Sequence, residues 1–333
     1  SRSKAESMKS KILSALRQSE GYISGQELCE RFGVSRTAVW KGINQLKNEG
    51  YQIEAVQNKG YRLCGYPDSI SRTELESRMY TKWAGKNLIC LDSVDSTNDY
   101  IKKLAEEGAP HGTLAVADYQ SGGKGRRGRS WVTPHGTAIA MSILVRPTLA
   151  PEKASMMTLV AGMAVAKSVR EVTGLDVKIK WPNDVVINGK KISGTLTEMS
   201  MELGAIHYIV IGTGINANVT EFPDEIRDVA TSLILKKGKK VDRAAIICAH
   251  MEAFEDFYDR FMKYGDMTLL REDYQELLAN QNQQVRVLEP GNEYTGTARG
   301  IDELGQLLVE KEDGSLVKVY AGEVSVRGIY NYV

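Results

Sequence analysis

Gly122-Gly123-Lys124-Gly125-Arg126-Arg127-Gly128-Arg129 restricts the possible folds of this 333-residue chain more than any other stretch. Its glycines at 123, 125 and 128 have the G-x-G-x-x-G spacing of a dinucleotide-binding turn. Such a turn requires a helix directly afterwards and an acidic residue about 20 positions further on. Trp131-Val132-Thr133-Pro134 follows instead and residue 146 is arginine, which excludes that fold. The chain also has no G-x-x-x-x-G-K-[ST] sequence, which excludes a P-loop enzyme.

Glycine and cations in equal number make this octet a candidate anion site. Glycines let backbone N–H groups approach a ligand closely, while Lys and Arg bind phosphate or carboxylate oxygens. From the octet alone, a solvated loop and a nucleic-acid-binding patch remain alternatives. A ligand site is favoured by three further polar motifs, Asp95-Ser96-Thr97-Asn98 at a helix start, Lys180-Trp181-Pro182-Asn183-Asp184 before a hairpin, and Gly212-Thr213-Gly214-Ile215-Asn216 at a strand end.

Strand and helix patterns alternate between Pro67 and residue 280. We predict strands over 88–91, 114–117, 138–145, 177–180, 185–187, 192–196 and 208–211, and helices over 96–107, 152–172 and 242–263. Asn188-Gly189 is the predicted turn of a hairpin between 185–187 and 192–196, and Lys190 and Lys191 lie just past that turn. Residues 67–280 are therefore expected to form one mixed α/β domain built on a single sheet.

The first fifth of the chain is basic. Residues 1–66 carry eleven Lys or Arg and six Glu, a net charge of +5, whereas the other 267 residues carry 32 basic and 36 acidic side chains, a net charge of −4. Apolar spacing predicts a helix over 8–18, and Ser24 and Ser35 are candidate N-caps of two further helices separated by Gly33. This is the helix-turn-helix pattern.

Two features of residues 1–66 favour DNA binding. The third helix has a polar and basic face, formed by Arg36, Thr37, Trp40, Lys41 and Asn44. Asn58-Lys59-Gly60 then predicts a hairpin turn, the wing of a winged helix, with Lys59 and Arg62 placed for phosphates. The alternative is a three-helix module used only for packing or protein contacts.

Composition points to an ordinary globular protein, since 42% of the residues are hydrophobic and 26% are charged. The longest mostly apolar stretch, Leu159 to Val169, is too short for a membrane span of about 20 residues, so no membrane partner is expected. Cys29, Cys64, Cys90 and Cys248 lie far apart without a C-x-x-C pair. We therefore expect a cytoplasmic protein without a disulfide framework or zinc ribbon.

These motifs, in this order, resemble the biotin protein ligases. Ser96-Thr97-Asn98, Gln120, the Gly/Arg octet, residues 180–184, Gly189 to Gly194 and Gly214-Ile215-Asn216 carry the resemblance. The winged helix makes the chain similar to the bifunctional class, in which the ligase is also the biotin operon repressor. The resemblance implies an α+β multidomain protein with a winged helix-turn-helix over 1–66, a ligase domain over 67–280 and a small SH3-like β-barrel over 281–333.

The resemblance also implies a two-step reaction that uses biotin, ATP and Mg²⁺. Biotin's carboxylate attacks the α-phosphate of ATP, giving biotinyl-5′-AMP and pyrophosphate, and a carrier lysine then displaces AMP. Cations are needed because a carboxylate and a polyphosphate repel each other. The implied partners are the biotin carboxyl carrier domain of acetyl-CoA carboxylase or of another carboxylase, operator DNA, and a second copy of the chain once the adenylate is bound.

The family's functional residues are carried over by motif. The implied catalytic residues are Lys124, Arg126, Asp184 and Lys191. The implied biotin-binding residues are Ser96, Thr97, Asn98, Gln120, Lys124, Gly125, Arg126 and Lys191, and the nucleotide-binding residues are Arg126, Arg127, Arg129, Asn183 and Asn216. Asp184 would position magnesium or the incoming amine, and no metal ligand set is assigned.

Several of these residues also have simpler interpretations. Ser96 is a candidate helix N-cap, Lys191 follows a hairpin turn as solvated lysines often do, and Trp181 could belong to the core. Lys124 departs from the family's usual Gly-Arg-Gly, and since lysine cannot make arginine's bidentate contact, weaker ligand retention is expected. The competing functions are a lipoate-type ligase and a DNA-binding sensor of biotin or a nucleotide without ligase turnover.

Overall fold

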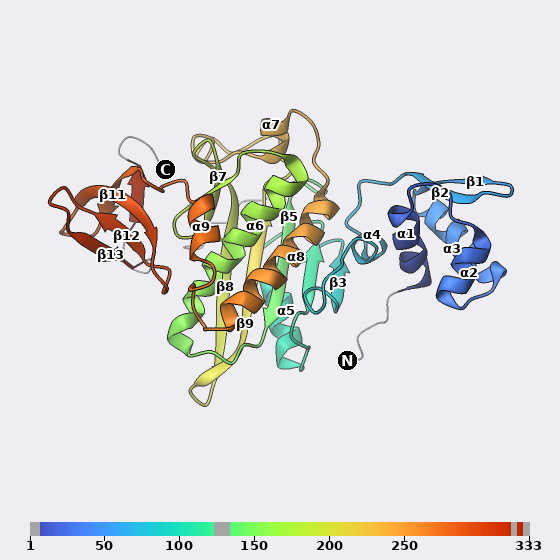
Figure 1. Ribbon diagram of the computed structural model, residues 1–333, viewed down its shortest axis with the longest axis horizontal. Helices are drawn as coiled ribbons and strands as arrows, with labels where there is room; N and C mark the ends of the chain where they lie inside the picture. The colour runs from blue at the N-terminus through green and yellow to red at the C-terminus, as the bar shows by residue number, and fades with distance from the viewer. Residues whose placement is uncertain (1–6, 123–133, 321–324, 329–333) are drawn as a thin grey trace.

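The computed structural model describes residues 7–122, 134–320 and 325–328. Figure 1 shows three parts in a row: an N-terminal helical part, a central sheet with its helices, and a C-terminal sheet. Among the described residues, no helix is both long enough and apolar enough to cross a membrane.

The N-terminal part contains the predicted helix-turn-helix. Its elements are α1 (Met8–Gln18), α2 (Gly25–Phe32), α3 (Arg36–Asn48), β1 (Gln52–Val56) and β2 (Gly60–Gly65). The hydroxyls of Ser24 and Ser35 accept from the N–H groups of Glu27 and Ala38, as the cap patterns predict. The core is apolar and includes Ile12, Leu16, Leu28, Val39, Ile43 and Leu46.

The β1–β2 hairpin is anchored to the segment before α2. Ile23 and Tyr61 exchange two backbone hydrogen bonds of 2.9 and 2.8 Å. At Gly60, φ is +110° and a Cβ would lie only 2.2 Å from the Ile23 carbonyl oxygen. Gly60 therefore permits both the turn and the close approach that fixes the wing.

The central part is built on one seven-stranded sheet in the order β3-β4-β5-β9-β8-β7-β6. The strands are β3 (Leu88–Leu91), β4 (Leu114–Ala117), β5 (Ile139–Val145), β6 (Lys178–Lys180), β7 (Asp184–Ile187), β8 (Lys190–Glu202) and β9 (Ala205–Ile215). Only β3 and β4 are parallel neighbours, so the sheet is mixed, as predicted. Two strands are longer than predicted: β8 has 13 residues, where 192–196 was predicted, and β9 has 11 residues, where 208–211 was predicted.

The two faces of this sheet pack against different helices. The 3₁₀ helix η2 (Pro151–Met156) and the helices α6 (Met157–Thr173) and α8 (Arg243–Met262) contribute to the large core on one face. Helix α5 (Thr97–Glu106) packs on the other face, where Ile101 and Ala105 meet Leu144 and Val210 in a smaller cluster. The predicted helix at 152–172 thus begins as 3₁₀, and the short helices α4 (Arg72–Glu76), α7 (Leu233–Lys237) and α9 (Arg271–Leu277) were not predicted.

The C-terminal part is a five-stranded antiparallel sheet in the order β13-β12-β11-β10-β14. Its strands are β10 (Gln284–Leu288), β11 (Tyr294–Ile301), β12 (Leu307–Glu310), β13 (Leu316–Val319) and β14 (Ser325–Gly328).

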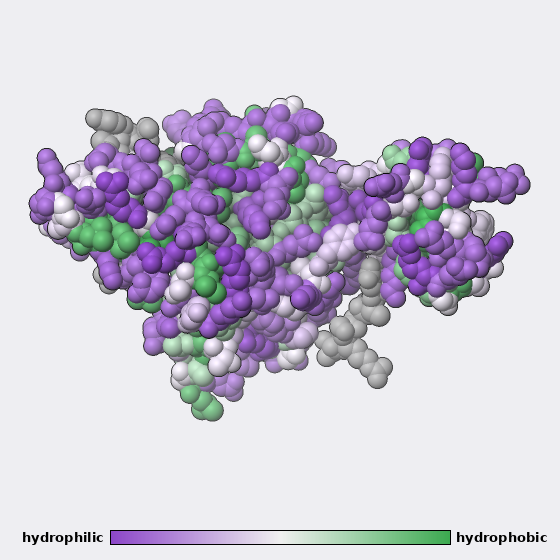
Figure 2. All heavy atoms as spheres, viewed as in Figure 1, coloured by the Kyte–Doolittle hydropathy of each residue, from purple (hydrophilic) through white to green (hydrophobic). Residues whose placement is uncertain are grey.

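The surface of the whole molecule is mostly hydrophilic on the side seen in Figure 2. An apolar tip lies at the β8–β9 turn of the central part, where Leu203 is fully exposed.

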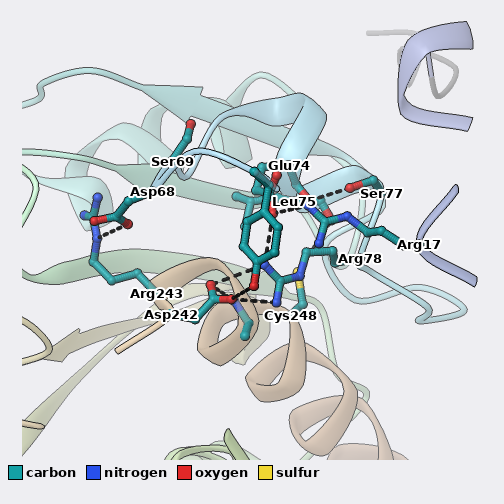
Figure 3. Close-up of polar contacts among 12 residues, drawn as sticks. Arg17, Asp68, Ser69, Glu74, Leu75, Ser77, Arg78, Asp242, Arg243 and Cys248 are labelled. Carbon is teal, nitrogen blue, oxygen red and sulfur yellow. Dashed lines mark hydrogen bonds and ion pairs between the residues drawn. The ribbon is translucent and has the colours of Figure 1, made fainter. Parts of the chain in front are cut away.

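Glu74 of α4 joins the N-terminal part to the central part. Its side chain is fully buried, and its carboxylate accepts from Arg17 of α1 at 2.5 Å and from Arg78 at 2.9 Å, and from the Tyr51 hydroxyl. Figure 3 shows Arg17 and Arg78 converging on this carboxylate. Because a buried carboxylate is costly unless it is paired, Glu74 depends on partners from both parts.

The chain of ion pairs continues to the first residues of α8. Arg78 also donates to Asp242 at 2.9 Å, and Asp242 caps α8 by accepting from the N–H of Ala245 at 3.0 Å. The next residue, Arg243, is 3% exposed and donates to Asp118 at 2.9 Å, two residues before Gln120. Charged side chains thus connect α1 with the segment that follows β4. Figure 3 shows this series from Arg17 to Arg243, where Arg243 also lies near Asp68.

Glu74→Gln is expected to lower the free energy of unfolding by about 3 kcal/mol, because it leaves Arg17 and Arg78 less well paired in a buried position. Urea unfolding monitored by circular dichroism measures this change.

The matched control is Glu27→Gln, which breaks an exposed pair with Arg31 on α2 and should cost less than about 0.5 kcal/mol. Equal effects of the two substitutions would show that the buried pairing of Glu74 contributes nothing special.

Candidate functional site

Beyond the N-terminal end of α5, no helix of the described residues covers a strip of the central sheet. The strand register places Ala140 opposite Gly214, and Gly214 opposite Gly194, on the face that α5 covers elsewhere. A Cβ built on Gly214 would have no described atom nearer than 3.9 Å. We call Ala140, Gly194 and Gly214 the small-residue floor, since their side chains leave room for a flat ligand above the strands.

The predicted residues Ser96, Thr97 and Asn98 lie together at the start of α5 and are nearly buried. The Ser96 hydroxyl accepts from the N–H of Asp99 at 3.3 Å, so the N-cap interpretation of Ser96 is confirmed. Asn98 donates to the Leu196 carbonyl at 3.3 Å and to Glu198 at 3.0 Å. These contacts give Ser96 and Asn98 structural roles whether or not they touch a ligand.

Gln120 ties the segment after β4 to the same helix start. Its side-chain oxygen accepts from the backbone N–H of Thr97 at 2.9 Å and from the Thr97 hydroxyl at 3.2 Å. Ser121 and Gly122 continue this contact by donating backbone hydrogen bonds to Val94 and Asp95, at 3.0 and 2.7 Å. Residues from two distant segments of the chain are thereby held at one end of the floor.

Lys191 lies at the other end of the floor, at the start of β8. A Cβ on Gly194 would lie 3.5 Å from Lys191 Cε, so the lysine side chain extends over that glycine. Lys191 Nζ is 3.3 Å from Asp184 Oδ1, and the Lys191 backbone pairs with Val229 and Thr231. The structure therefore brings together Lys191 and Asp184, two of the predicted site residues.

Asn183 and Asn216 both have structural partners. Asn183 is buried against Gly162, where an added Cβ would lie 3.3 Å from the asparagine backbone. Asn216 donates its N–H to Ile192 at 2.7 Å and its side-chain amide to Thr231 at 3.1 Å. Asn216 therefore holds the loop that runs beside Lys191.

The predicted cationic residues Lys124, Gly125, Arg126, Arg127 and Arg129 lie outside the described residues. The residues flanking the gap are described, and Gly136 donates its N–H to the Asp118 carbonyl at 3.5 Å. Tyr119 and His135 stack with ring centroids 3.9 Å apart. Residues on the two sides of the gap thus meet near Gln120.

Comparison with known proteins identifies the family of this chain. A model of the biotin/lipoate A/B protein ligase family matches residues 90–216, a helix-turn-helix domain model matches residues 9–62, and a biotin protein ligase C-terminal domain model matches residues 282–327. The bifunctional ligase/repressor BirA of Bacillus subtilis is 41% identical over 309 residues, which cover 92% of this chain and 94% of that protein. The chain belongs to the bifunctional biotin protein ligases.

Two further relatives of this ligase support the assignment. The biotin–[acetyl-CoA-carboxylase] ligase of Mycobacterium tuberculosis is 33% identical over 236 residues. The aligned region covers 69% of this chain and 85% of that ligase. The solved structure of a biotin protein ligase from Aquifex aeolicus in complex with biotin and ATP has a TM-score of 0.61 and 31% identity. It covers 72% of this chain and 98% of the Aquifex chain.

The predicted DNA-binding face of this ligase is solvent-accessible. Arg36, Thr37 and Lys41 are exposed on α3, Trp40 is 60% exposed, and Asn44 is half-buried. In the wing, Lys59 lies 5.5 Å from the centre of the Tyr22 ring. Arg62 lies over the same ring but is paired with Glu54 at 2.9 Å, so Arg62 is less available for phosphate than predicted.

Lys180 is a site residue that motif reasoning left without a role. It is 5% exposed and lies opposite Asp184 in the β6–β7 pair. Burial lowers the pKa of Lys180 to about 8, against the opposing effect of Asp184 and with smaller contributions from Arg327 and Lys191. Trp181 beside it is core, since its indole N–H donates to the Gly305 carbonyl at 3.0 Å and joins this motif to the C-terminal sheet. Burial depends on tertiary packing, so no local pattern could predict the environment of Lys180.

The lowered pKa of Lys180 makes stability depend on pH. Above pH 8 the folded lysine loses its proton, whereas the unfolded lysine keeps it to about pH 10.4, so stability rises between these values. Relative to Lys180→Met, the wild-type free energy of unfolding should increase by on the order of 2–3 kcal/mol over this range. Urea titrations at several pH values measure it, and parallel curves for the two proteins would contradict it.

Proposed function

We propose that this protein joins biotin to a lysine of the biotin carboxyl carrier domain of acetyl-CoA carboxylase, and represses biotin genes in response to biotin. The observation that carries the proposal is the small-residue floor between two polar ends. Thr97 and Gln120 lie at one end and Lys191 with Asp184 at the other. Such a site suits a ligand with a polar ring at one end, a carboxylate at the other end, and an apolar chain between them that lies over the floor.

Lys191 is the proposed centre of the first step. A biotin carboxylate oxygen forms a bond to the α-phosphorus of ATP while the bond to the pyrophosphate oxygen breaks, and pyrophosphate leaves with the electron pair. The Lys191 ammonium offsets the negative charge that accumulates between the two reactants. Lys124 and Arg126 are proposed to assist from the segment outside the described residues, with Gly125 giving backbone access.

In the second step the acceptor lysine's amine attacks the mixed anhydride carbonyl, AMP leaves and the nitrogen loses a proton. Asp184 is proposed to receive or orient this amine, since Asp184 lies against Lys191. Mg²⁺ would be held chiefly by ATP phosphates and water, because Asp184 already neighbours two lysines and no cluster of three potential ligands occurs among the described residues.

Recognition of the two substrates is proposed to be divided along the floor. Thr97 and Gln120 would bind the ring of biotin, with Ser96 and Asn98 shaping that end. Arg127, Arg129, Asn183 and Asn216 would form the nucleotide side. The ligase domain is proposed to span residues 67–280 and the winged helix residues 1–66.

Repression is proposed to use the exposed face of α3 together with Lys59. Adenylate binding would favour a homodimer, whose two winged helices would meet paired half-sites of operator DNA in the cytoplasm. Residues 281–333 are proposed to close into an SH3-like barrel, which is supported by the five antiparallel strands.

The ligase half-reaction is tested by native mass spectrometry after incubation with MgATP and either biotin or lipoate. Wild type should retain a mass equal to biotinyl-5′-AMP and nothing with lipoate. Lys191→Ala should lose the retained adenylate, because the cation between the reacting groups is gone.

Lys190→Ala is the matched control: among the described residues the Lys190 ammonium donates to the Arg227 carbonyl at 3.4 Å, away from Asp184, so this variant should retain the adenylate. Bound biotin without adenylate in the wild type would favour the sensor function instead, and an adenylate of lipoate would favour the lipoate-type ligase.

DNA binding is tested by the salt dependence of affinity for a fluorescent random-sequence duplex, with biotin and MgATP present. Lys41→Ala should weaken binding and reduce the slope of log affinity against log salt by about 0.9, the value for one phosphate contact. Lys167→Ala removes a charge that is also exposed, on α6 of the central part, and should leave the slope unchanged. Identical slopes for all three proteins would exclude Lys41 from the phosphate contacts.

A further inference from the structure

Ser142 places a hydroxyl on β5 between Ala140 and Leu144, under the start of α5. It lies in the middle of β5, is fully buried, and points to the face that carries Ala140 and Leu144. Its one hydroxyl hydrogen is shared between Thr97 Oγ1 at 2.7 Å and Asn98 Oδ1 at 2.5 Å, since the amide oxygen can only accept and Thr97 donates its own hydrogen to Gln120. A buried hydroxyl is costly without hydrogen bonds, and both of these partners belong to the first turn of α5.

Asn98 is held by three strands in one orientation. Its amide hydrogens are donated to Leu196 and Glu198 of β8, which leaves its oxygen for Ser142. The same oxygen would lie 2.2 Å from a Cβ on Gly212 of β9, so Asn98 fills the space that this glycine provides. The first turn of α5 is thereby fixed against the sheet, with Ser142 at the point of contact.

Thr97 in turn orients the side chain of Gln120. The Gln120 side-chain oxygen accepts from both the N–H and the hydroxyl of Thr97. A backbone N–H can only donate, so the Gln120 oxygen must face Thr97 and its nitrogen must face away. Among the described residues, the Gln120 amide nitrogen has no hydrogen-bond partner, which leaves two donors for a ligand.

We infer that Ser142 is a positioning residue, which orients Thr97 so that Gln120 presents its amide N–H groups to a carbonyl oxygen on the ring of the bound acid. This inference rests on the proposed function. It explains how the site would select biotin over lipoate. The ureido ring of biotin has a carbonyl oxygen that accepts hydrogen bonds, whereas the dithiolane ring of lipoate has none. A site built around fixed donors rejects a ligand that leaves them unpaired.

The test is the biotin dependence of pyrophosphate release with MgATP. In Ser142→Ala, Thr97 loses the donor that orients its hydroxyl, so the amide of Gln120 is less well fixed. KM for biotin should rise about tenfold, the effect of one hydrogen bond. The kcat at saturating biotin should stay within about twofold, because Lys191 and Asp184 act at the other end of the floor.

Two variants separate this role from a general loss of packing. Ser168→Ala removes an equally buried hydroxyl that bonds only within α6, to the Val165 carbonyl at 3.0 Å, and should leave KM unchanged. Ser142→Cys keeps a weak donor at the same position and should give an intermediate KM.

The outcomes distinguish this inference from the proposed function. If Ser142→Ala has the KM of wild type, or loses kcat with an unchanged KM, the positioning role is overturned while the ligase function stands. If the wild type releases no pyrophosphate and calorimetry detects no biotin binding, both are overturned.

Discussion

Among the described residues, helices cover the two faces of the seven-stranded sheet to different extents, and the candidate site depends on this difference. Helices α6 and α8 cover one face with a continuous core, whereas α5 covers only part of the other. Alternation along the antiparallel strands then places Ala140, Gly194 and Gly214 on the same uncovered strip. A larger residue at any of these positions would fill the space from below, so the site is a property of strand register as much as of its polar residues.

The charges of the site are arranged around one carboxylate. Asp184 contacts Lys191 and lies opposite Lys180, so an acidic group separates two cations that would otherwise repel each other. This arrangement allows Lys191 to remain beside the floor while Lys180 is buried. The carboxylate therefore has a structural role in the unliganded protein, in addition to the part proposed for it in amine transfer.

Local signals in the sequence predicted more of this protein than long-range ones. The caps at Ser24, Ser35 and Ser96 and the Asn188-Gly189 turn are decided within a few residues, and the structure confirms each of them. The role of Ser142 could not be predicted, because its partners Thr97 and Asn98 lie some 45 positions away. Glu74 was missed for the same reason, since a short helix with a charged residue gives no hint of burial until another part of the chain covers it.

The junction at Glu74 has a consequence for any attempt to separate the parts of this protein. Two partners of the buried Glu74 carboxylate, Arg17 and Tyr51, come from the winged helix, and a third, Arg78, comes from the central part. A shortened chain without residues 1–66 would lose the first two of these partners and would also expose α4 to water. The central part of this protein is therefore adapted at α4 to the presence of the winged helix, and removal of the winged helix would leave a carboxylate that is less completely paired.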